Sequence, residues 1–302
     1  MSFRLKLFSL GGRLFIKPLF RVSATPEKDA ERMDKVAQRF IQIRPYTSVL
    51  TRPLGNSDAV WVTGQGANPA RVVFYLHGGG YFAGSPELYG GLMSRLSRDA
   101  DAMIVGVRYR LSPTAPFPAA FDDALAAYLD LIDRGYRPEN IVMGGDSAGG
   151  GLTLALLAEL CRRDLRPAGV FALSPWTDLT LSGPSVAANA AKDPLLPADR
   201  MHEAVTAYVG DTPADDPRIS PLFADFDAPP PILFQVGSPE ILEDDTYRLA
   251  TRLEREGAEV QVETWHGAPH GWHMGEYWVP EAKAALRRVA QFVQTSFDRA
   301  SR

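Results

Sequence analysis

The amino-acid sequence predicts an α/β fold in which a doubly wound, mostly parallel sheet is covered by helices on both faces. From residue 70 onward, short runs rich in β-branched residues alternate with longer stretches of helical periodicity or composition. Several of the short runs are apolar almost throughout, as is typical of parallel strands that are buried on both sides. Alternating strands and helices imply crossover connections and hence a parallel sheet.

Six runs are predicted to form strands: RVVFYL (71–76), AMIVGVRY (102–109), NIVMGG (140–145), AGVFALS (168–174), PILFQVG (231–237) and AEVQVETW (258–265). The predicted helices span residues 88–99, 118–134, 148–163, 244–256 and 281–298. Segments near 45–50 and 59–63 are expected to add an antiparallel hairpin at the sheet edge, with LGNSD as its turn.

Two regions, residues 1–42 and 178–225, do not follow this alternation. The second is far longer than a crossover needs and is rich in proline around one predicted helix, 197–209. Its apolar content indicates an ordered insertion, and long insertions in compact domains are often functional. We therefore predict that residues 1–42 and 178–225 form a helical cap over the carboxyl ends of the strands, where open α/β sheets bind ligands. Residues 43–177 and 226–302 would form the catalytic core.

The composition excludes several classes of function. The chain has 302 residues and a net charge of −4, which argues against nucleic acid as a partner because phosphate binders present a basic surface. The single cysteine, Cys161, cannot form an internal disulfide, and its place in an apolar helix favours buried packing over a nucleophilic role.

The first 22 residues are apolar and basic and contain no acid. Gly11, Gly12 and Arg13 interrupt the apolar run, which argues against a secretory signal and against a bilayer span. An amphipathic helix packed on the protein's own surface is the favoured interpretation, and an interfacial helix that touches lipid is the alternative. We expect no stable membrane insertion and a cytoplasmic protein.

The strongest chemical motif is GDSAG, Gly145–Gly149, between the strand NIVMGG and the apolar helix that follows. In a G-x-S-x-G turn the serine lies in a tight strand-to-helix connection, and the two glycines let the backbones approach each other. Ser147 is therefore the predicted nucleophile, and the amide of Ala148 is a predicted donor to an oxyanion. A structural serine is the alternative, which the strand–turn–helix context makes the weaker one.

A second motif, HGGG (77–80), follows the strand RVVFYL. Consecutive glycines free backbone N–H groups to point at a ligand, so the amides of Gly78 and Gly79 are predicted to join Ala148 in an oxyanion hole. A glycine-rich turn without a function would be the better interpretation of HGGG alone. No P-loop lysine follows it, which argues against phosphate binding.

Together, HGGGYF (77–82), YRLSPTAPFPAAFDD (109–123) and GDSAGGG (145–151) resemble the bacterial hormone-sensitive-lipase family of esterases. The segments SPWTDLT (174–180), NAAKDPLL (189–196), SPLFADF (220–226) and QVGSPEILEDD (235–245) are similar to the branch that contains monoterpene ε-lactone hydrolases. The resemblance implies an α/β-hydrolase core, a helical cap from the N-terminus and an insertion, frequent homodimers and no cofactor.

The base is predicted to be His270. Of the five histidines, His77 belongs to the glycine-rich loop and His202 to the cap, whereas the triad histidine of this fold follows the last strand. There His266 is too close to the strand end, and His273 is expected to enter the next helix. His270 lies between them in a loop, and PHGW resembles the histidine motif of the family.

A metal site is the rival interpretation of these three closely spaced histidines. Zinc ligands at i and i+4 need a helix, which Gly267, Pro269 and Gly271 disfavour, and no cysteine cluster or glutamate accompanies them. We therefore predict no metal.

The acid is expected after the strand 231–237, where Glu240, Glu243, Asp244 and Asp245 are the candidates. Many members of the family have aspartate at the position of Glu240. Asp244 and Asp245 are interpreted as the N-cap and first turn of the next helix. Glu240 is the predicted triad acid, and a solvated turn residue is the alternative for it.

Two further carboxylates are assigned supporting positions. Asp146 is interpreted as a brace for the glycine-rich loop, although the sequence does not identify its partner. Either Asp122 or Asp123 is expected to anchor the preceding loop, which contains Pro113, Pro116 and Pro118.

These residues predict a carboxylic ester hydrolase that forms an acyl-enzyme on small-molecule esters. The predicted cap of residues 1–42 and 178–225, together with the resemblance, implies a preference for short acyl chains. A lactonase, an amidase or a deacetylase on the same machinery is the first alternative. A non-catalytic ligand receptor on the same fold is the second, and the presence of Ser147, a carboxylate turn and His270 argues against it.

Overall fold

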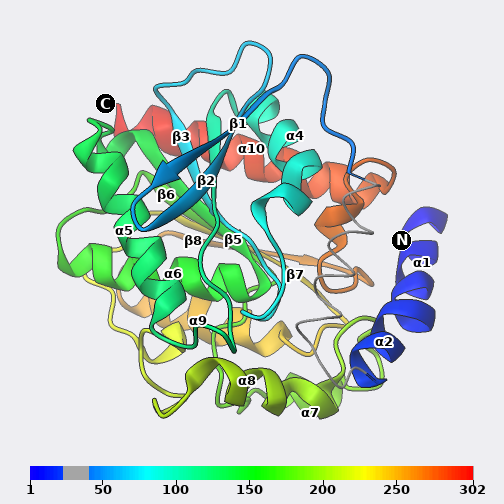
Figure 1. Ribbon diagram of the computed structural model, residues 1–302. Helices are drawn as coiled ribbons and strands as arrows, with labels where there is room; N and C mark the ends of the chain where they lie inside the picture. The colour runs from blue at the N-terminus through cyan, green and yellow to red at the C-terminus, as the bar shows by residue number, and fades with distance from the viewer. Residues whose placement is uncertain (23–40, 302) are drawn as a thin grey trace.

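A computed structural model describes residues 1–22 and 41–301. It contains one eight-stranded sheet with the order β1-β2-β4-β3-β5-β6-β7-β8 (Figure 1). The strands are β1 Ser48–Leu54, β2 Ser57–Thr63, β3 Val72–Leu76, β4 Met103–Val107, β5 Ile141–Asp146, β6 Gly169–Leu173, β7 Ile232–Gly237 and β8 Val260–Trp265. The pairs β1–β2 and β2–β4 are antiparallel, and all other pairs are parallel. The predicted fold class is confirmed.

Helices cover both faces of the sheet, each over its own apolar core. On one face lie α5 (Ala119–Asp133), α6 (Ser147–Arg162) and α9 (Glu243–Arg255), and on the other lie α4 (Gly90–Ala100) and α10 (Pro280–Ala300). Within β3, Phe74 belongs to the first core, whereas Val73 and Tyr75 belong to the second. This alternation follows from the two-residue period of a strand, and it explains why the strand sequence is apolar throughout.

The edge hairpin is present, but its first strand begins later than predicted. Residues 45 and 46 form a turn in which Tyr46 has a φ of 57°, so pairing starts only at Ser48. The strand then runs on to Leu54, opposite Ser57. The predicted turn is therefore placed correctly, and the predicted strand is shifted, because the left-handed backbone at Tyr46 cannot continue a strand.

The insertion at 178–225 contains short helices that lie against the loops at the carboxyl ends of the strands. These helices are α7 (Pro184–Ala188) and α8 (Met201–Val209), the latter preceded by a 3-10 turn at Ala198–Arg200. Tyr208 of α8 accepts a backbone hydrogen bond from Phe117 in the loop after β4. Asn189, after α7, donates to the carbonyl of Glu240 in the loop after β7.

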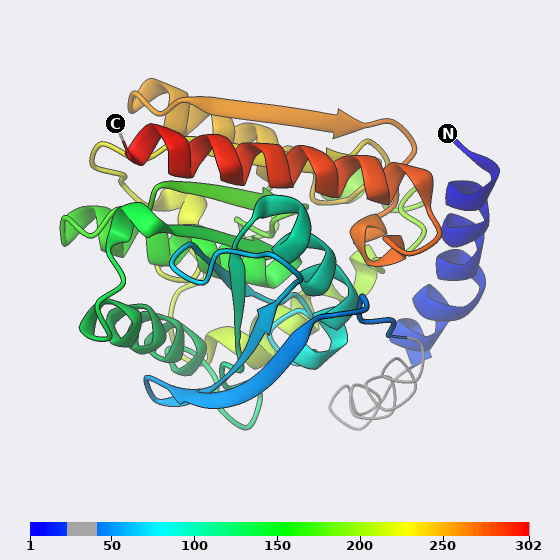
Figure 2. The ribbon, with the colours of Figure 1, turned by 90° about the horizontal axis from the view of Figure 1, so that it is seen from above.

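The first helical segment runs through α1 (Phe3–Gly11), a π-helical turn (Gly12–Ile16) and α2 (Lys17–Val22). It lies beyond the carboxyl ends of the parallel strands, where the arrowhead of β8 points toward it (Figure 2). Leu5 packs with Trp272, and Lys17 Nζ donates to the carbonyls of Ala190 and Asp193 in the insertion. The rest of the predicted N-terminal cap, residues 23–40, lies outside the described residues. Across residues 1–22 and 41–301, no helix has the length and apolar character that a membrane crossing requires.

Candidate active site

Ser147 is the first residue of α6 and lies in a tight turn directly after β5. Its φ of 52° is left-handed, a conformation that costs a non-glycine residue free energy and turns its side chain out of the sheet. A Cβ at Gly145 would lie 2.4 Å from the carbonyl oxygen of Gly149, and one at Gly149 would lie 2.2 Å from those of Leu76 and His77. The two glycines of the motif therefore permit the close approach that the sequence predicted for them.

His270 lies between Ser147 and Glu240. Its Nδ1 is 2.7 Å from Glu240 Oε2, and its Nε2 is 2.9 Å from Ser147 Oγ. A carboxylate can only accept, so the proton of the neutral imidazole belongs on Nδ1, and Nε2 accepts from the serine hydroxyl. The structure thus brings together the three residues that the sequence selected, from the ends of β5, β7 and β8.

Glu240 is completely buried, so the interpretation of this residue as a solvated turn residue is wrong. Its Oε1 accepts hydrogen bonds from the amide of Gly237 at 2.5 Å and from Ser174 Oγ at 2.7 Å. With the imidazole on Oε2, the carboxylate has three donors, which compensate for its removal from water.

The insertion holds the turn that carries Glu240. Asn189 Nδ2 donates to the Glu240 carbonyl at 2.9 Å, and Asp193 Oδ2 accepts from the amide of Ile241 at 3.0 Å. Asp193 Oδ1 accepts from the amides of Leu195 and Leu196. In the sequence, Ser174, Asn189 and Asp193 are marked only by lying in segments that resemble the family. Single polar residues in an irregular segment carry no periodicity that would reveal their partners.

The interpretation of Asp244 as the N-cap of α9 is wrong, because Leu242 occupies the cap position and α9 begins at Glu243. Asp244 and Asp245 lie in the first turn but reach across to the chain after β6. Asp244 Oδ2 accepts from the amide of Ser185 at 2.6 Å. The buried Asp245 accepts from the amides of Thr177 and Asp178. Both therefore stabilise the start of the insertion.

The assignment of Gly78 to the oxyanion hole requires correction. Its amide donates to Asp146 Oδ1 at 2.9 Å and approaches the hydroxyl of Tyr89 at 3.1 Å, and the residue is buried. Asp146 thus braces the loop, as the sequence suggested, and it also accepts from Tyr75 and Tyr89. The only N–H group of Gly78 is already hydrogen-bonded to Asp146, so it cannot donate to a substrate.

The next two glycines of the loop have a different environment. Gly79 and Gly80 are only half-buried, with φ angles of 125° and 62° that favour glycine. The following residue, Tyr81, stacks on Tyr208 of α8 with ring centroids 3.7 Å apart and the planes 4° from parallel. Two contacts therefore hold the glycine-rich loop: the hydrogen bond from the Gly78 amide to Asp146, and the stacking of Tyr81 on Tyr208 of the insertion.

The remaining histidines occupy separate positions. His266 and His202 are exposed, whereas His273 lies in a 3-10 turn, where its Nε2 is 2.9 Å from Gln235 Oε1. His77 is buried and stacks on Tyr109. In the described residues, no group of three or more histidine, cysteine, aspartate or glutamate side chains has metal-binding geometry. Cys161 is free and buried, in agreement with packing.

The buried histidines differ in their pKa because only one faces a carboxylate. Burial disfavours the imidazolium of His270, but the hydrogen bond and negative charge of Glu240 outweigh burial and raise the pKa of His270 above 6.5. Burial lowers the pKa of His77 to about 4 and that of His273 to about 3. Burial also raises the pKa of Asp146, against the effect of its three hydrogen-bond donors.

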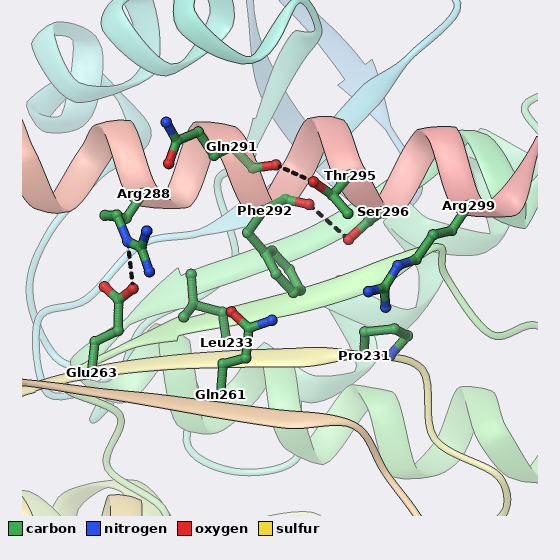
Figure 3. Close-up of a pocket in the computed structure, with 10 residues that line it drawn as sticks. All are labelled: Pro231, Leu233, Gln261, Glu263, Arg288, Gln291, Phe292, Thr295, Ser296 and Arg299. Atoms are coloured by element: carbon green, nitrogen blue, oxygen red, sulfur yellow. Dashed lines mark hydrogen bonds and ion pairs between the residues drawn. The ribbon is translucent and has the colours of Figure 1, made fainter.

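A hollow between α10 and the strands β7 and β8 is a separate feature (Figure 3). Pro231 and Gln261 line it near the amino ends of these strands, whereas Ser147, Glu240 and His270 follow strand carboxyl ends. Arg288 closes one side by an ion pair with Glu263 at 2.7 Å (Figure 3). The hollow is therefore not part of the candidate active site.

The sequence and the structure of this chain are similar to those of known proteins. The profile of the alpha/beta hydrolase fold family matches residues 73–274. An esterase of Acinetobacter venetianus is 37% identical over 77% of this chain and 77% of its own length. An acetyl-hydrolase of Streptomyces hygroscopicus is 36% identical over 80% of this chain and 81% of its own. The crystal structure of an esterase from the bacterial hormone-sensitive lipase family superposes with a TM-score of 0.92 at 33% identity, covering 98% of this chain and 99% of that one.

We predict that an NMR titration of the histidine rings will separate these environments. The His270 ring should titrate above 6.5, whereas the rings of His77 and His273 should stay neutral to about 4 and about 3. Glu240→Gln should lower the pKa of His270, because burial would then act without the opposing charge. Signals would be assigned with one His→Asn variant for each ring. A His270 pKa below 6.5 in the unmodified protein would contradict this account of the site.

Proposed function

Because this chain belongs to the bacterial hormone-sensitive-lipase family of α/β-hydrolases and hydrolyses carboxylic esters, we propose that it does so with a triad of Ser147, His270 and Glu240. The observation that supports the proposal most is the continuous chain of short contacts from Ser147 Oγ through the imidazole to the buried Glu240 carboxylate. Covalent acyl transfer needs a nucleophile, a base and an acid that orients the base, each within hydrogen-bond distance of the next.

In the proposed reaction, Ser147 Oγ attacks the ester carbonyl while its proton passes to His270 Nε2. The resulting imidazolium, stabilised by Glu240, then protonates the leaving alcohol as the C–O bond breaks and the acyl-serine remains. Water repeats the sequence: His270 takes its proton, the hydroxide equivalent adds to the acyl carbon, and Ser147 leaves with the proton returned to it. His270 must be neutral when the reaction begins. We therefore expect kcat/KM to fall with decreasing pH around the pKa of His270, which is raised above 6.5.

For the oxyanion hole we propose the amides of Gly79, Gly80 and Ala148. Gly79 and Ala148 were expected from the sequence, and Gly80 replaces Gly78, whose amide is bound to Asp146. Two supporting observations are the partial exposure of Gly79 and Gly80 and the position of Ala148 in the first turn of α6, where amides lack partners within the helix. Such donors stabilise the charge that develops on the carbonyl oxygen in the transition state.

We predict that Ser147→Ala and His270→Ala each lower kcat by several orders of magnitude without unfolding the protein, about 10⁴-fold or more. Glu240→Gln keeps the side chain's size but removes its charge and should cost on the order of 10⁴-fold in kcat. The matched control is Asp244→Asn, which changes a neighbouring carboxylate bonded to Ser185 and should lower stability by about 1 kcal/mol with little change in kcat. If Asp244→Asn loses more turnover than Glu240→Gln, the acid is misassigned.

A second prediction concerns Asp146, which acts by positioning the glycine-rich loop. Asp146→Asn should lower kcat about ten- to a hundredfold with little change in KM, because a displaced loop weakens transition-state stabilisation more than substrate binding. Tyr89→Phe removes one of the three hydrogen bonds to Asp146 and should cost less. Thermal unfolding checks that both variants are folded. Unchanged kcat in folded Asp146→Asn would show that the loop does not depend on this carboxylate.

For the substrate we propose small esters with short acyl chains, with lactones as the alternative on the same machinery. The support is the position of the insertion, whose Tyr208 stacks on Tyr81, the residue that follows the glycine-rich loop, and accepts from the amide of Phe117. We expect kcat/KM for p-nitrophenyl esters to be highest at short chain lengths and to fall as the acyl chain grows. Faster hydrolysis of long-chain esters would overturn the short-chain proposal, and preference for a lactone over its open-chain ester would favour the alternative. The homodimer and the cytoplasmic location stay predictions.

A further inference from the structure

The helical segment of residues 3–22 carries apolar side chains on two opposite sides. Leu5, Phe8 and Gly12 face the protein, where Phe8 meets Trp278 and Gly12 meets the chain at 194–195. On the other side, residues 3, 7, 10 and 14 follow the spacing that aligns side chains along one face of a helix. This outer stripe is exposed to solvent: Phe3 78%, Leu7 49%, Leu10 49% and Leu14 57%.

Positive charge borders the outer stripe. Residues 1–22 hold five Lys or Arg and no acid, although the whole chain has a net charge of −4. At 100° per residue, Arg4 lies on one flank of the stripe and Lys6 on the other. Arg4 and Arg13 donate to the backbone carbonyls of Trp278 and Lys192, and within residues 1–22 and 41–301 neither forms an ion pair with a carboxylate. Further along, Arg21 pairs with Asp199 at 3.3 Å.

We propose that the outer stripe, with its cationic flanks, docks this protein on an anionic phospholipid surface. An apolar helix face bordered by Lys and Arg can sink to the depth of the acyl chains while the charges stay at the headgroups. A second copy of the chain fits less well, because two such faces would bring their cationic flanks together. The inward side of the helix is already packed, so docking needs no unfolding.

The position of the outer stripe determines which end of the protein would face a membrane. The segment lies beyond the carboxyl ends of the parallel strands (Figure 2). Ser147 and His270 follow the carboxyl ends of β5 and β8 in the chain, so they belong to the same end of the sheet. Its Lys17 is bonded to the insertion through Ala190 and Asp193. A bound membrane would therefore lie at the end of the sheet that carries the candidate site. The inference stands independently of the triad, because it concerns binding and not turnover.

The test is co-sedimentation of the full chain with vesicles of phosphatidylcholine and phosphatidylglycerol in equal parts, compared with phosphatidylcholine alone. The unmodified protein should bind the anionic vesicles more tightly and lose that advantage at high salt. The combined variant Leu7→Gln, Leu10→Gln, Leu14→Gln should lower vesicle affinity about tenfold or more, because glutamine keeps helix propensity but removes apolar area. Lys6→Gln with Arg13→Gln keeps the stripe and should reduce binding to anionic vesicles to the level of the neutral ones.

The matched control removes apolar side chains that are exposed to a comparable degree on and before β1: Tyr46→Gln, Val49→Thr and Leu50→Gln. This variant should bind vesicles like the unmodified protein. Hydrolysis of p-nitrophenyl butyrate in solution reports that each variant is folded. The proposal is overturned if the unmodified protein binds neither vesicle, if the leucine variant binds as well as the control, or if that variant only converts a dimer to a monomer.

Discussion

The contact on which the site depends most is the approach of the first turn of α6 to the end of β3. The backbone at Gly149 comes so near to the carbonyls of Leu76 and His77 that no side chain fits between them. This approach fixes the start of α6 beside the glycine-rich loop, so that Ser147 and the backbone of the loop are held in one rigid frame. Asp146 closes the frame, since it precedes Ser147 in the chain and binds the amide of Gly78. A buried carboxylate with three donors is costly to displace, which keeps the loop in register with the serine.

The other half of the site is held by the insertion. Glu240 is fully buried, and its turn is bonded to Asn189 and Asp193 from the segment after α7. The same segment receives Lys17 from the first helix. Hydrogen bonds thus run from the first helix through the insertion to the turn of Glu240, whose carboxylate contacts His270. The residues of the insertion therefore hold the turn that carries Glu240, which a simple crossover between β6 and β7 would not do.

The sequence was sufficient for the sheet and the helices, because strand and helix periodicity are local properties. It also selected Ser147, His270 and Glu240 as a candidate triad, and these three side chains lie in hydrogen-bond contact. It was insufficient where a side chain's partner is distant in the chain. Gly78 was assigned to the oxyanion hole because all glycines of HGGG look alike, and only the position of Asp146, 68 residues later, shows that its amide is occupied. Asp244 was assigned as a cap because acids often begin helices, whereas its partner Ser185 lies in the insertion. The late start of β1 depends on the backbone of Tyr46, which composition does not reveal.

The stack of Tyr81 on Tyr208 has a consequence for how such an enzyme can change its preference. One ring follows the glycine-rich loop and the other belongs to α8, and they lie flat against each other. Moving α8 outward would remove the surface on which Tyr81 rests, so any room gained in this way is expected to come with less order in the glycine-rich loop. Selection or engineering toward bulkier substrates by this route would then need a paired change, in which a new contact for Tyr81 arises together with the displacement of α8. Substitutions at Tyr208 alone are expected to lower kcat while they widen the range of substrates.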